Sequence, residues 1–231
     1  MLLDQETESD VASELCQLLG RAILPVRASD AGEDHFGTAF FCTGPGRDEY
    51  LLTAATLAGV PRVTLGLRPS VTEPAGVAGD SVEANGGAWV RPAGVGVAVL
   101  PSTGLHQEAA GQGWHWRTQA VPDALAADTD AIARIGAEPG SAIVLALGVG
   151  ADGSRRLEVA IERVARHGDT VRVDAEMPDG YLGAPVFGVH DDDGEIGLRC
   201  LGLVLPARDG GHPIATFDRI RAALADLPTV T

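Results

Sequence analysis

The chain has 231 residues, of which 45% are hydrophobic and 4% aromatic, and its formal net charge is −15. This length and apolar content allow one sizeable core and exclude wholesale disorder, while the acidic balance disfavours binding to nucleic acid or to an anionic membrane. All 17 basic residues are arginine, a bias that suggests a GC-rich bacterial genome.

The first element predicted is a helix ending before Gly20, within an N-terminal segment 1–21. Ser9 or Asp10 can accept hydrogen bonds from backbone N–H groups at its start. The apolar positions that follow have helical spacing: Val11, Leu15, Leu18 and Leu19. We expect this helix to pack on the outside of the domain, with a partner-binding helix as the alternative.

After residue 21 the pattern changes to short apolar or alternating runs divided by Gly, Pro, Asp and Asn, which is typical of a closed or sandwiched β-domain. The first β-unit covers residues 22–101. Residues 102–138 interrupt the rhythm and are predicted to connect two β-units, with a helical turn near 122–127. Strand patterns resume over 139–231, and "FDRIRAALADL" at the end has helical spacing.

The three cysteines, Cys16, Cys42 and Cys200, lie far apart and form no CxxC pattern. A sparse, odd set predicts reduced thiols and favours a cytoplasmic protein. The acidic start "MLLDQETESD" differs from a secretory signal, and no apolar run reaches the length of a membrane span. No metal-ligand spacing is present, so we expect neither a metal nor a cofactor.

Three strings resemble the sequence signatures of the trypsin-like, or chymotrypsin-fold, serine peptidases. They are "GTAFFCTGPGRDEYLLTAATLAG" at 37–59, "VGVAVLP" at 95–101 and "GYLGAPVFG" at 180–188. In that family they deliver the catalytic histidine, aspartate and serine, in this order. The resemblance covers about residues 22–226 and implies a mainly β protein of two six-stranded antiparallel barrels, with short N- and C-terminal helices.

Carried over to this sequence, the family's triad falls on Thr56 for the base, Gly96 for the orienting acid and Leu182 for the nucleophile. The triad needs an imidazole that takes the serine proton and a carboxylate that orients this imidazole. Threonine, glycine and leucine supply neither group, so the sequence predicts an inactive member of the family.

Other residues of the resembling region are candidates for binding. Gly180 and the amide of Leu182 keep the backbone pattern that forms the oxyanion hole in the family, and Gly183 keeps the tight turn after it. This loop is needed either for packing alone or to hold a carbonyl or carboxylate of a bound peptide. Trp114 and Trp116, in the connector, are predicted to pack across the barrels or to form an aromatic recognition surface.

Two further patterns have simpler explanations. The six histidines show no nucleophile beside them in the sequence, so structural roles are expected. The string "HDDDGEIG" at 190–197 predicts a solvated hairpin tip, with a calcium site as the alternative, although its adjacent carboxylates lack the alternating spacing of a calcium loop.

The leading functional hypothesis is a catalytically inactive trypsin-like protein that binds a protein or peptide partner in a regulatory or assembly role. The first alternative is an active hydrolase whose catalytic residues lie elsewhere in the chain. The second is a structural module of a larger bacterial signalling, defence or biosynthetic system. The sequence does not predict the oligomeric state.

Overall fold

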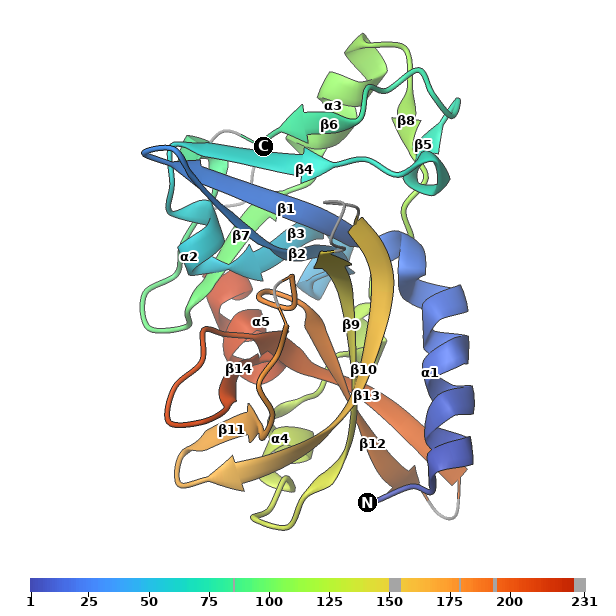
Figure 1. Ribbon diagram of the computed structural model, residues 1–231, viewed down its shortest axis with the longest axis vertical. Coiled ribbons are helices and arrows are strands. Elements are labelled where there is room, and N and C mark those ends of the chain that lie inside the picture. The colour runs from blue at the N-terminus through green and yellow to red at the C-terminus, as the bar shows by residue number, and fades with distance from the viewer. Residues whose placement is uncertain (85, 150–154, 179, 193–194, 227–231) are drawn as a thin grey trace.

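The computed structural model describes residues 1–84, 86–149, 155–178, 180–192 and 195–226. Two β-units lie one above the other, and the connector runs along both (Figure 1). None of the helices in these ranges is long and apolar enough to cross a membrane.

The first unit is a curled, six-stranded antiparallel sheet with the order β6-β4-β1-β2-β3-β7. Its central strands carry buried aromatic and branched side chains, among them Phe40 and Phe41, each fully buried. The strands are β1 (Ile23–Asp30), β2 (Glu33–Thr43), β3 (Glu49–Ala54), β4 (Arg62–Gly66), β6 (Ser81–Glu83) and β7 (Val97–Pro101).

This first sheet differs from the closed barrel that the sequence predicted. In the described residues its edge strands β6 and β7 do not pair. Instead Val90, in the link between them, exchanges two hydrogen bonds of 2.8 Å with Val99 of β7. Part of the free edge of β7 is therefore covered by the link rather than by β6, which leaves the sheet a half-barrel.

The second unit is a closed antiparallel barrel with the order β10-β11-β14-β13-β12-β9, so the mainly β two-barrel fold is confirmed. Its strands are β9 (Gly140–Val149), β10 (Arg155–His167), β11 (Thr170–Val173), β12 (Pro185–Asp192), β13 (Glu195–Val204) and β14 (His212–Thr216). β12 and β13 pair as a hairpin around the string at 190–197, whose tip, residues 193–194, lies outside the described residues.

Strand β9 shows how the core is divided. Successive side chains of a strand point to opposite faces, and here both faces are buried, which explains the unbroken apolar run of the sequence. Ala142, Val144 and Ala146 face the interior cluster of the second barrel. Ile143, Leu145 and Leu147 belong to the larger cluster that continues into the first sheet. One strand thus joins the two halves of the core.

Helix α1 (Gln5–Leu19) begins earlier than predicted. Its N-cap is Asp4, whose carboxylate accepts a 3.0 Å hydrogen bond from the Thr7 amide. Ser9 lies inside the helix, where its hydroxyl donates to Gln5 O, so the prediction of a cap at Ser9 or Asp10 is wrong. The helix packs along the second barrel (Figure 1), where Glu8 forms an ion pair of 2.7 Å with Arg163 of β10.

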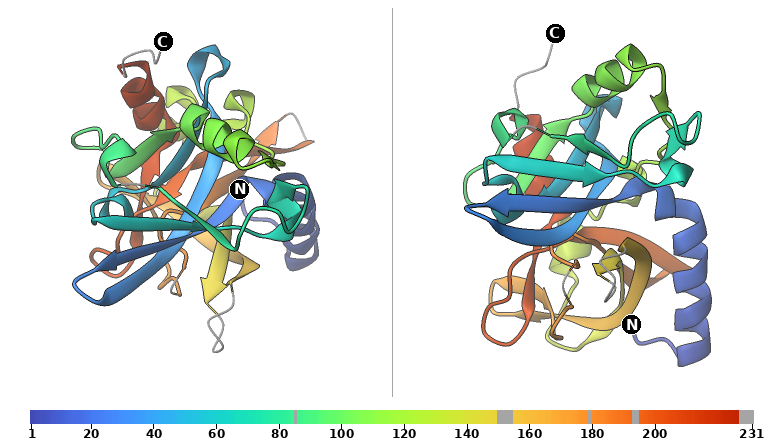
Figure 2. Two further views of the ribbon diagram at one scale, coloured as in Figure 1. Left: turned by 90° about the horizontal axis from the view of Figure 1, so that it is seen from above. Right: turned by 45° about the horizontal axis from the view of Figure 1, so that its top comes forward.

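The remaining helices are short. They are α2 (Ala55–Ala58), α3 (Thr103–Gly111), α4 (Thr129–Ala133) and α5 (Phe217–Ala225). The 3-10 turns are η1 (Gly20–Ala22), η2 (Pro45–Arg47), η3 (Pro69–Val71), η4 (Gly86–Ala88) and η5 (Asp123–Leu125). A small sheet of β5 (Thr72–Glu73) and β8 (His115–Trp116) lies with α3 beyond the first sheet, away from the second barrel (Figures 1 and 2).

The connector holds the two units together by backbone hydrogen bonds. Val121 pairs with the end of β2, since the Thr43 amide donates to Val121 O at 2.9 Å. A few residues later the Ala127 amide donates to Cys200 O of β13, also at 2.9 Å. The connector thus adds to one sheet and then to the other, and η5 lies between these two contacts.

Candidate functional site

The three positions carried over from the family's triad lie around the junction of the two units. Thr56 is exposed on α2, directly after β3. The amide of its neighbour Ala55 donates to Gly96 O at 2.9 Å, which places Gly96 beside the start of α2. Leu57, on the other side of Thr56, lies against Gly37, and Gly37 also faces the carbonyl of Leu182.

Thr38 of β2 holds the loop of Leu182 against the first sheet by hydrogen bonds. Its amide donates to Leu182 O at 2.8 Å, and its hydroxyl donates to Gly180 O at 2.6 Å. The same hydroxyl accepts a 3.1 Å hydrogen bond from the Leu147 amide of β9. Because Thr38 is fully buried, these bonds are shielded from water, and both units fix the conformation of this loop.

Glycine is required at position 183 for two independent reasons. Its φ is +83°, a conformation that costs an L side chain free energy. A methyl group at this position would also lie 2.6 Å from Thr53 Oγ1 and 3.0 Å from Ala54 N, and nearer still to Thr38 O. The loop therefore approaches the backbone of the first sheet as closely as only glycine allows.

Three of the five amides from Gly180 to Ala184 donate a hydrogen bond within the described residues, and two do not. Those of Tyr181, Gly183 and Ala184 donate to Pro178 O, Val204 O and Tyr181 O at 3.3, 2.9 and 2.9 Å. Those of Gly180 and Leu182 donate to no acceptor in the described part of the chain. Gly180 has a φ of +100°, and successive amides in such conformations form concavities that bind anions and carbonyl oxygens.

A hollow of about 350 Å³ lies beside this loop. Its apolar lining includes Phe36 of β2, Met177 and the half-buried Leu182. The described residues that line it include no serine, threonine or cysteine. The place where the family's nucleophile would attack is therefore lined by no hydroxyl or thiol that could replace the serine, among the described residues.

Two histidines line the hollow, and neither has the partners of a general base. The Nδ1 of His212 lies 2.9 Å from Leu205 O, and its Nε2 accepts from the Met177 amide at 3.3 Å. A ring nitrogen that faces a carbonyl must donate, and one that faces an N–H must accept. The ring of His212 therefore uses both nitrogens to hold two walls of the hollow together.

The carboxylate next to His35 is already engaged. Asp34 accepts from Arg27 at 2.6 Å through one oxygen and from the Ser29 hydroxyl at 2.6 Å through the other. The hydrogen bond from Arg27 and then that from Ser29 lower the pKa of Asp34. This carboxylate does not orient His35, and the hollow holds no acid–base dyad among the described residues.

The cysteines offer no nucleophile either. Cys42 and Cys200 are fully buried, and burial is the main cause that raises the pKa of both thiols well above the usual value. A reactive cysteine needs the opposite, a lowered pKa and exposure. Both side chains therefore act as small apolar groups of the core.

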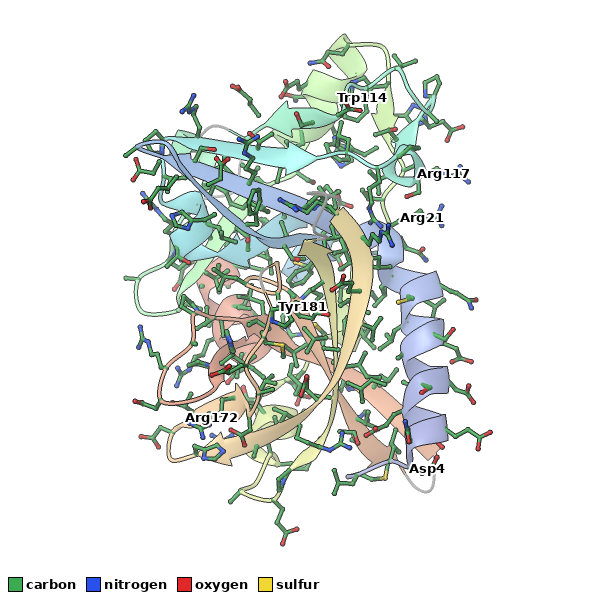
Figure 3. All side chains as sticks on the ribbon, viewed as in Figure 1. Asp4, Arg21, Trp114, Arg117, Arg172 and Tyr181 are labelled. Carbon is green, nitrogen blue, oxygen red and sulfur yellow. The ribbon has the colours of Figure 1, made fainter. Side chains whose placement is uncertain are left out.

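The two tryptophans of the connector are buried, with exposed fractions of 2% for Trp114 and 7% for Trp116. Their rings pack edge to face at 5.1 Å, and Trp116 also packs against Phe41 at 5.5 Å. Figure 3 shows Trp114 at the far end of the first unit, away from Tyr181 of the loop. Both rings are therefore core residues of the first unit: they do not pack across the two barrels, and their burial does not fit a recognition surface.

Three contacts of the site were missed by the sequence analysis. They are the hydrogen bonds of the Thr38 hydroxyl, the two contacts of the His212 ring, and the packing of the Leu205 side chain next to Gly96. The residues that bond the Thr38 hydroxyl, Gly180 and Leu147, each lie more than 100 residues from it in the sequence. Only the threonine of "GTAFF", within the family's own string, could have drawn attention to it.

The closed barrel, the curled sheet and the loop between them define a trypsin-like two-barrel fold. No family model matches the sequence, and no curated protein matches it either. Among solved structures, the chain is similar to the Rv3671c protease from M. tuberculosis in its active form, with a TM-score of 0.54 and 18% identity over 100% of this chain and 90% of that one.

Two other structures show the same fold. Deg5 has a TM-score of 0.56 at 16% identity, covering 94% of this chain and 93% of its own. The serine endoprotease from Yersinia pestis has a TM-score of 0.52 at 12% identity, covering 93% of this chain and 63% of its own. At such identities the similarity shows the fold alone, so activity has to be argued from this chain's own residues.

Proposed function

We propose that this chain is a catalytically inactive trypsin-like protein that binds a protein or peptide partner at the hollow beside Gly180 and Leu182, in a regulatory or assembly role. One observation carries the proposal. In a loop fixed by buried hydrogen bonds, the amides of Gly180 and Leu182 have no acceptor among the described residues, and no serine, threonine or cysteine among those residues lines the hollow beside them.

The inactivity follows from the side chains. Thr56 takes up no proton near neutral pH, Gly96 has no side chain to orient a base, and Leu182 has no nucleophilic atom. In a serine protease, loss of the nucleophile or the base alone lowers turnover by about 10⁶-fold. Here all three roles are lost together, and what remains of the site is its capacity to bind.

The binding mode follows from the geometry. A carbonyl or carboxylate oxygen of the partner accepts from the Gly180 and Leu182 amides, and an adjacent apolar side chain packs against Leu182, Phe36 and Met177. Each hydrogen bond contributes about 1 kcal/mol net, and burial of one apolar side chain about 1.5–3 kcal/mol. These terms total about 3.5–5 kcal/mol even before the cost of association, so we expect a short peptide to bind weakly, with a Kd on the order of 1 mM or above.

Other features of the chain support this proposal. A net charge of −15 favours a neutral or basic partner over nucleic acid. All three cysteines are free thiols, which supports a cytoplasmic location, and the lysine-free composition supports a bacterial source.

The test is a binding screen with a library of N-acetylated pentapeptides that have amidated carboxyl termini, so that each peptide is neutral or, where it contains arginine, basic. We expect peptides with apolar residues to bind and to shift the amide NMR signals of Gly180 and Leu182. Leu182→Asp places a carboxylate beside these amides and should weaken binding more than about 10-fold.

The matched control is Leu18→Asp, on the exposed face of α1, where Leu18 is 57% exposed. It makes the same chemical change away from the loop and should leave binding within about two-fold, with circular dichroism showing that both variants fold. Absence of any binding peptide, or equal affinity for the two variants, would overturn the proposal.

A further inference from the structure

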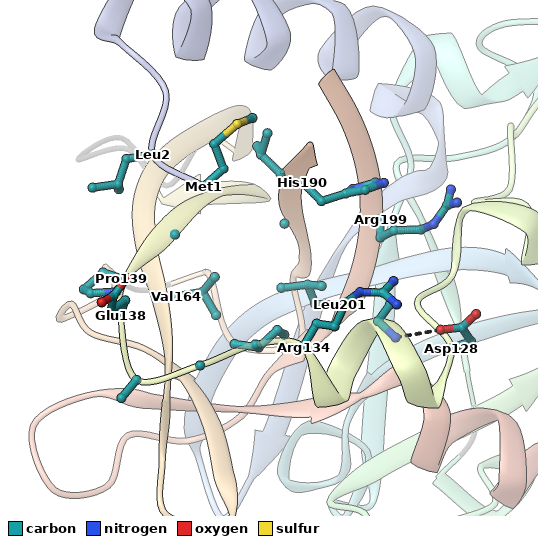
Figure 4. Close-up of a pocket in the computed structure, with 17 residues that line it drawn as sticks. Met1, Leu2, Asp128, Arg134, Glu138, Pro139, Val164, His190, Arg199 and Leu201 are labelled. Carbon is teal, nitrogen blue, oxygen red and sulfur yellow. Dashed lines mark hydrogen bonds between the residues drawn. The ribbon is translucent and has the colours of Figure 1, made fainter. Parts of the chain in front are cut away.

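The second barrel has an open end, which forms a second hollow of about 970 Å³, separate from the one beside Leu182. The loop after α4, the strands β10, β12 and β13, and the first residues of the chain surround it (Figure 4). Its size lies within the range of small-molecule sites, about 300–1,000 Å³.

The floor of this hollow is apolar because it is the end of the barrel's interior. Val164 and Leu201, each 5% exposed, belong to the interior cluster of the barrel and also line the hollow. Gly188 of β12 faces the same space, and the side chain of Leu201 lies where its Cβ would be, at 2.7 Å. The absence of a side chain at position 188 makes room for Leu201 on the floor of the hollow.

Two arginines stand at one side of the mouth. Arg134 follows α4 directly, Arg199 lies on β13, and both lie near Asp128, on the side opposite Glu138 (Figure 4). Neither guanidinium forms a hydrogen bond or an ion pair with any residue in the described ranges. An arginine presents five N–H donors, and here those of two side chains remain available for a ligand.

Asp128 does not neutralise this pair. Its Oδ1 accepts a 2.7 Å hydrogen bond from the Ala131 amide and so caps α4. That bond is the main cause that lowers the pKa of Asp128, and the nearby charges of Arg134 and Arg199 add to it. The two arginines and the two carboxylates of the lining balance in charge, but they are separated in space: both guanidinium groups lie beside Asp128, which is already engaged, while Glu138 lies on the opposite side (Figure 4).

We propose that this end of the second barrel binds a small amphiphilic carboxylate, with its apolar chain against Val164 and Leu201 and its carboxylate between Arg134 and Arg199. Arginine forks match the geometry of a carboxylate and form charge-assisted hydrogen bonds with it. The apolar floor continues from the barrel's interior, so it accepts an unbranched chain rather than a second charged group. This proposal does not depend on the one for the hollow beside Leu182.

The probe is decanoate, titrated below its micelle concentration by calorimetry, with methyl NMR signals of Val164 and Leu201 as the readout of location. We expect one bound molecule, shifts at both residues, and affinity that falls with added salt. Arg134→Gln and Arg199→Gln should each weaken binding about 10-fold, the effect of losing one charge-assisted hydrogen bond.

Three controls separate the contribution of the two arginines, the contribution of the ligand's carboxylate and any loss of folding. Arg219→Gln removes an exposed arginine of α5 that makes no ion pair among the described residues, and it should change affinity by less than about two-fold. Decanol and decyltrimethylammonium, which share the chain but lack the carboxylate, should bind at least about 10-fold more weakly. Circular dichroism should show all variants folded.

The proposal is overturned if decanoate fails to bind, if it binds without shifting Val164 and Leu201, or if decanol binds equally well. It is also overturned if the arginine variants match Arg219→Gln, or if the acetylated pentapeptides displace decanoate from these residues, because a peptide site would then explain the hollow.

Discussion

The hollow beside Leu182 and the hollow at the open end of the second barrel differ in the hydrogen-bond donors that they offer to a ligand. Beside Leu182 no described serine, threonine or cysteine lines the hollow, and the donors that we propose for a ligand are the backbone amides of Gly180 and Leu182. At the open end of the second barrel the available donors are the side chains of Arg134 and Arg199. The first hollow should therefore respond to changes that move the backbone, and the second to changes of side-chain charge.

The largest effect is expected at Gly183. Gly183→Ala adds a methyl group to a residue with a φ of +83° and pushes it against Thr38, Thr53 and Ala54. We expect the free energy of unfolding to fall by about 4 kcal/mol or more, measured by urea denaturation.

Gly76→Ala is the matched control for that prediction. Gly76 has nearly the same φ, +82°, but nothing lies within 4 Å of its added methyl group. Its cost should be the conformational strain alone, about 1 kcal/mol. Equal losses for the two variants would show that the loop of Leu182 does not press against the first sheet.

The next largest effect is expected from Thr38→Val, which keeps the shape but removes the hydroxyl. The Gly180 carbonyl and the Leu147 amide then lose their buried partner. We expect a loss of about 2–4 kcal/mol in the free energy of unfolding, together with weaker pentapeptide binding, since the loop is no longer fixed. Thr103→Val, at an exposed position of α3, should cost less than about 0.5 kcal/mol.

The last effect concerns Tyr181, next to Leu182, and it is a pH dependence of stability that appears only above pH 10. Burial first, and then the charges of Glu158 and Glu162, raise the pKa of Tyr181 from 10.0 to about 12. Since the folded state holds this proton more tightly than the unfolded state, the contribution to stability is complete below pH 10. It is lost as the pH rises from 10 to about 12.

Ultraviolet titration of a Tyr50→Phe variant, which leaves Tyr181 as the last tyrosine, should give a midpoint near pH 12. Stability measured between pH 10 and 12 should decline less steeply in Tyr181→Phe than in the unaltered chain. A midpoint at pH 10 would show that this part of the loop is open to water.

The sequence predicted what depends on local pattern. The short apolar run "YLLTAATL", of which residues 50–54 lie in β3 and 55–57 in α2, and the unbroken run of β9 predicted strands. The strings around Thr56, Gly96 and Leu182 predicted the two-barrel fold. The predicted start of α1 was wrong because several residues near the N-terminus can cap a helix. The earlier start allows the Asp4 carboxylate to accept hydrogen bonds from both the amide and the hydroxyl of Thr7.

The rest depends on contacts between distant parts of the chain. Thr38 and Gly180 are 142 residues apart, and His212 meets Met177 across 35 residues. The hollow lined by Arg134, Arg199 and Val164 forms only when the barrel closes. The burial of Trp114 and Trp116 was likewise undecided, because aromatic side chains in a connector fit both a core and a surface.

The central claim is that the hollow beside Leu182 binds a peptide without cleaving it. The most direct measurement is prolonged incubation of the protein with its tightest-binding pentapeptide at saturation, followed by mass spectrometry of the peptide. The account predicts that the peptide is recovered intact while NMR shows Gly180 and Leu182 occupied. Cleavage that increases with protein concentration and disappears in Leu182→Asp would contradict it.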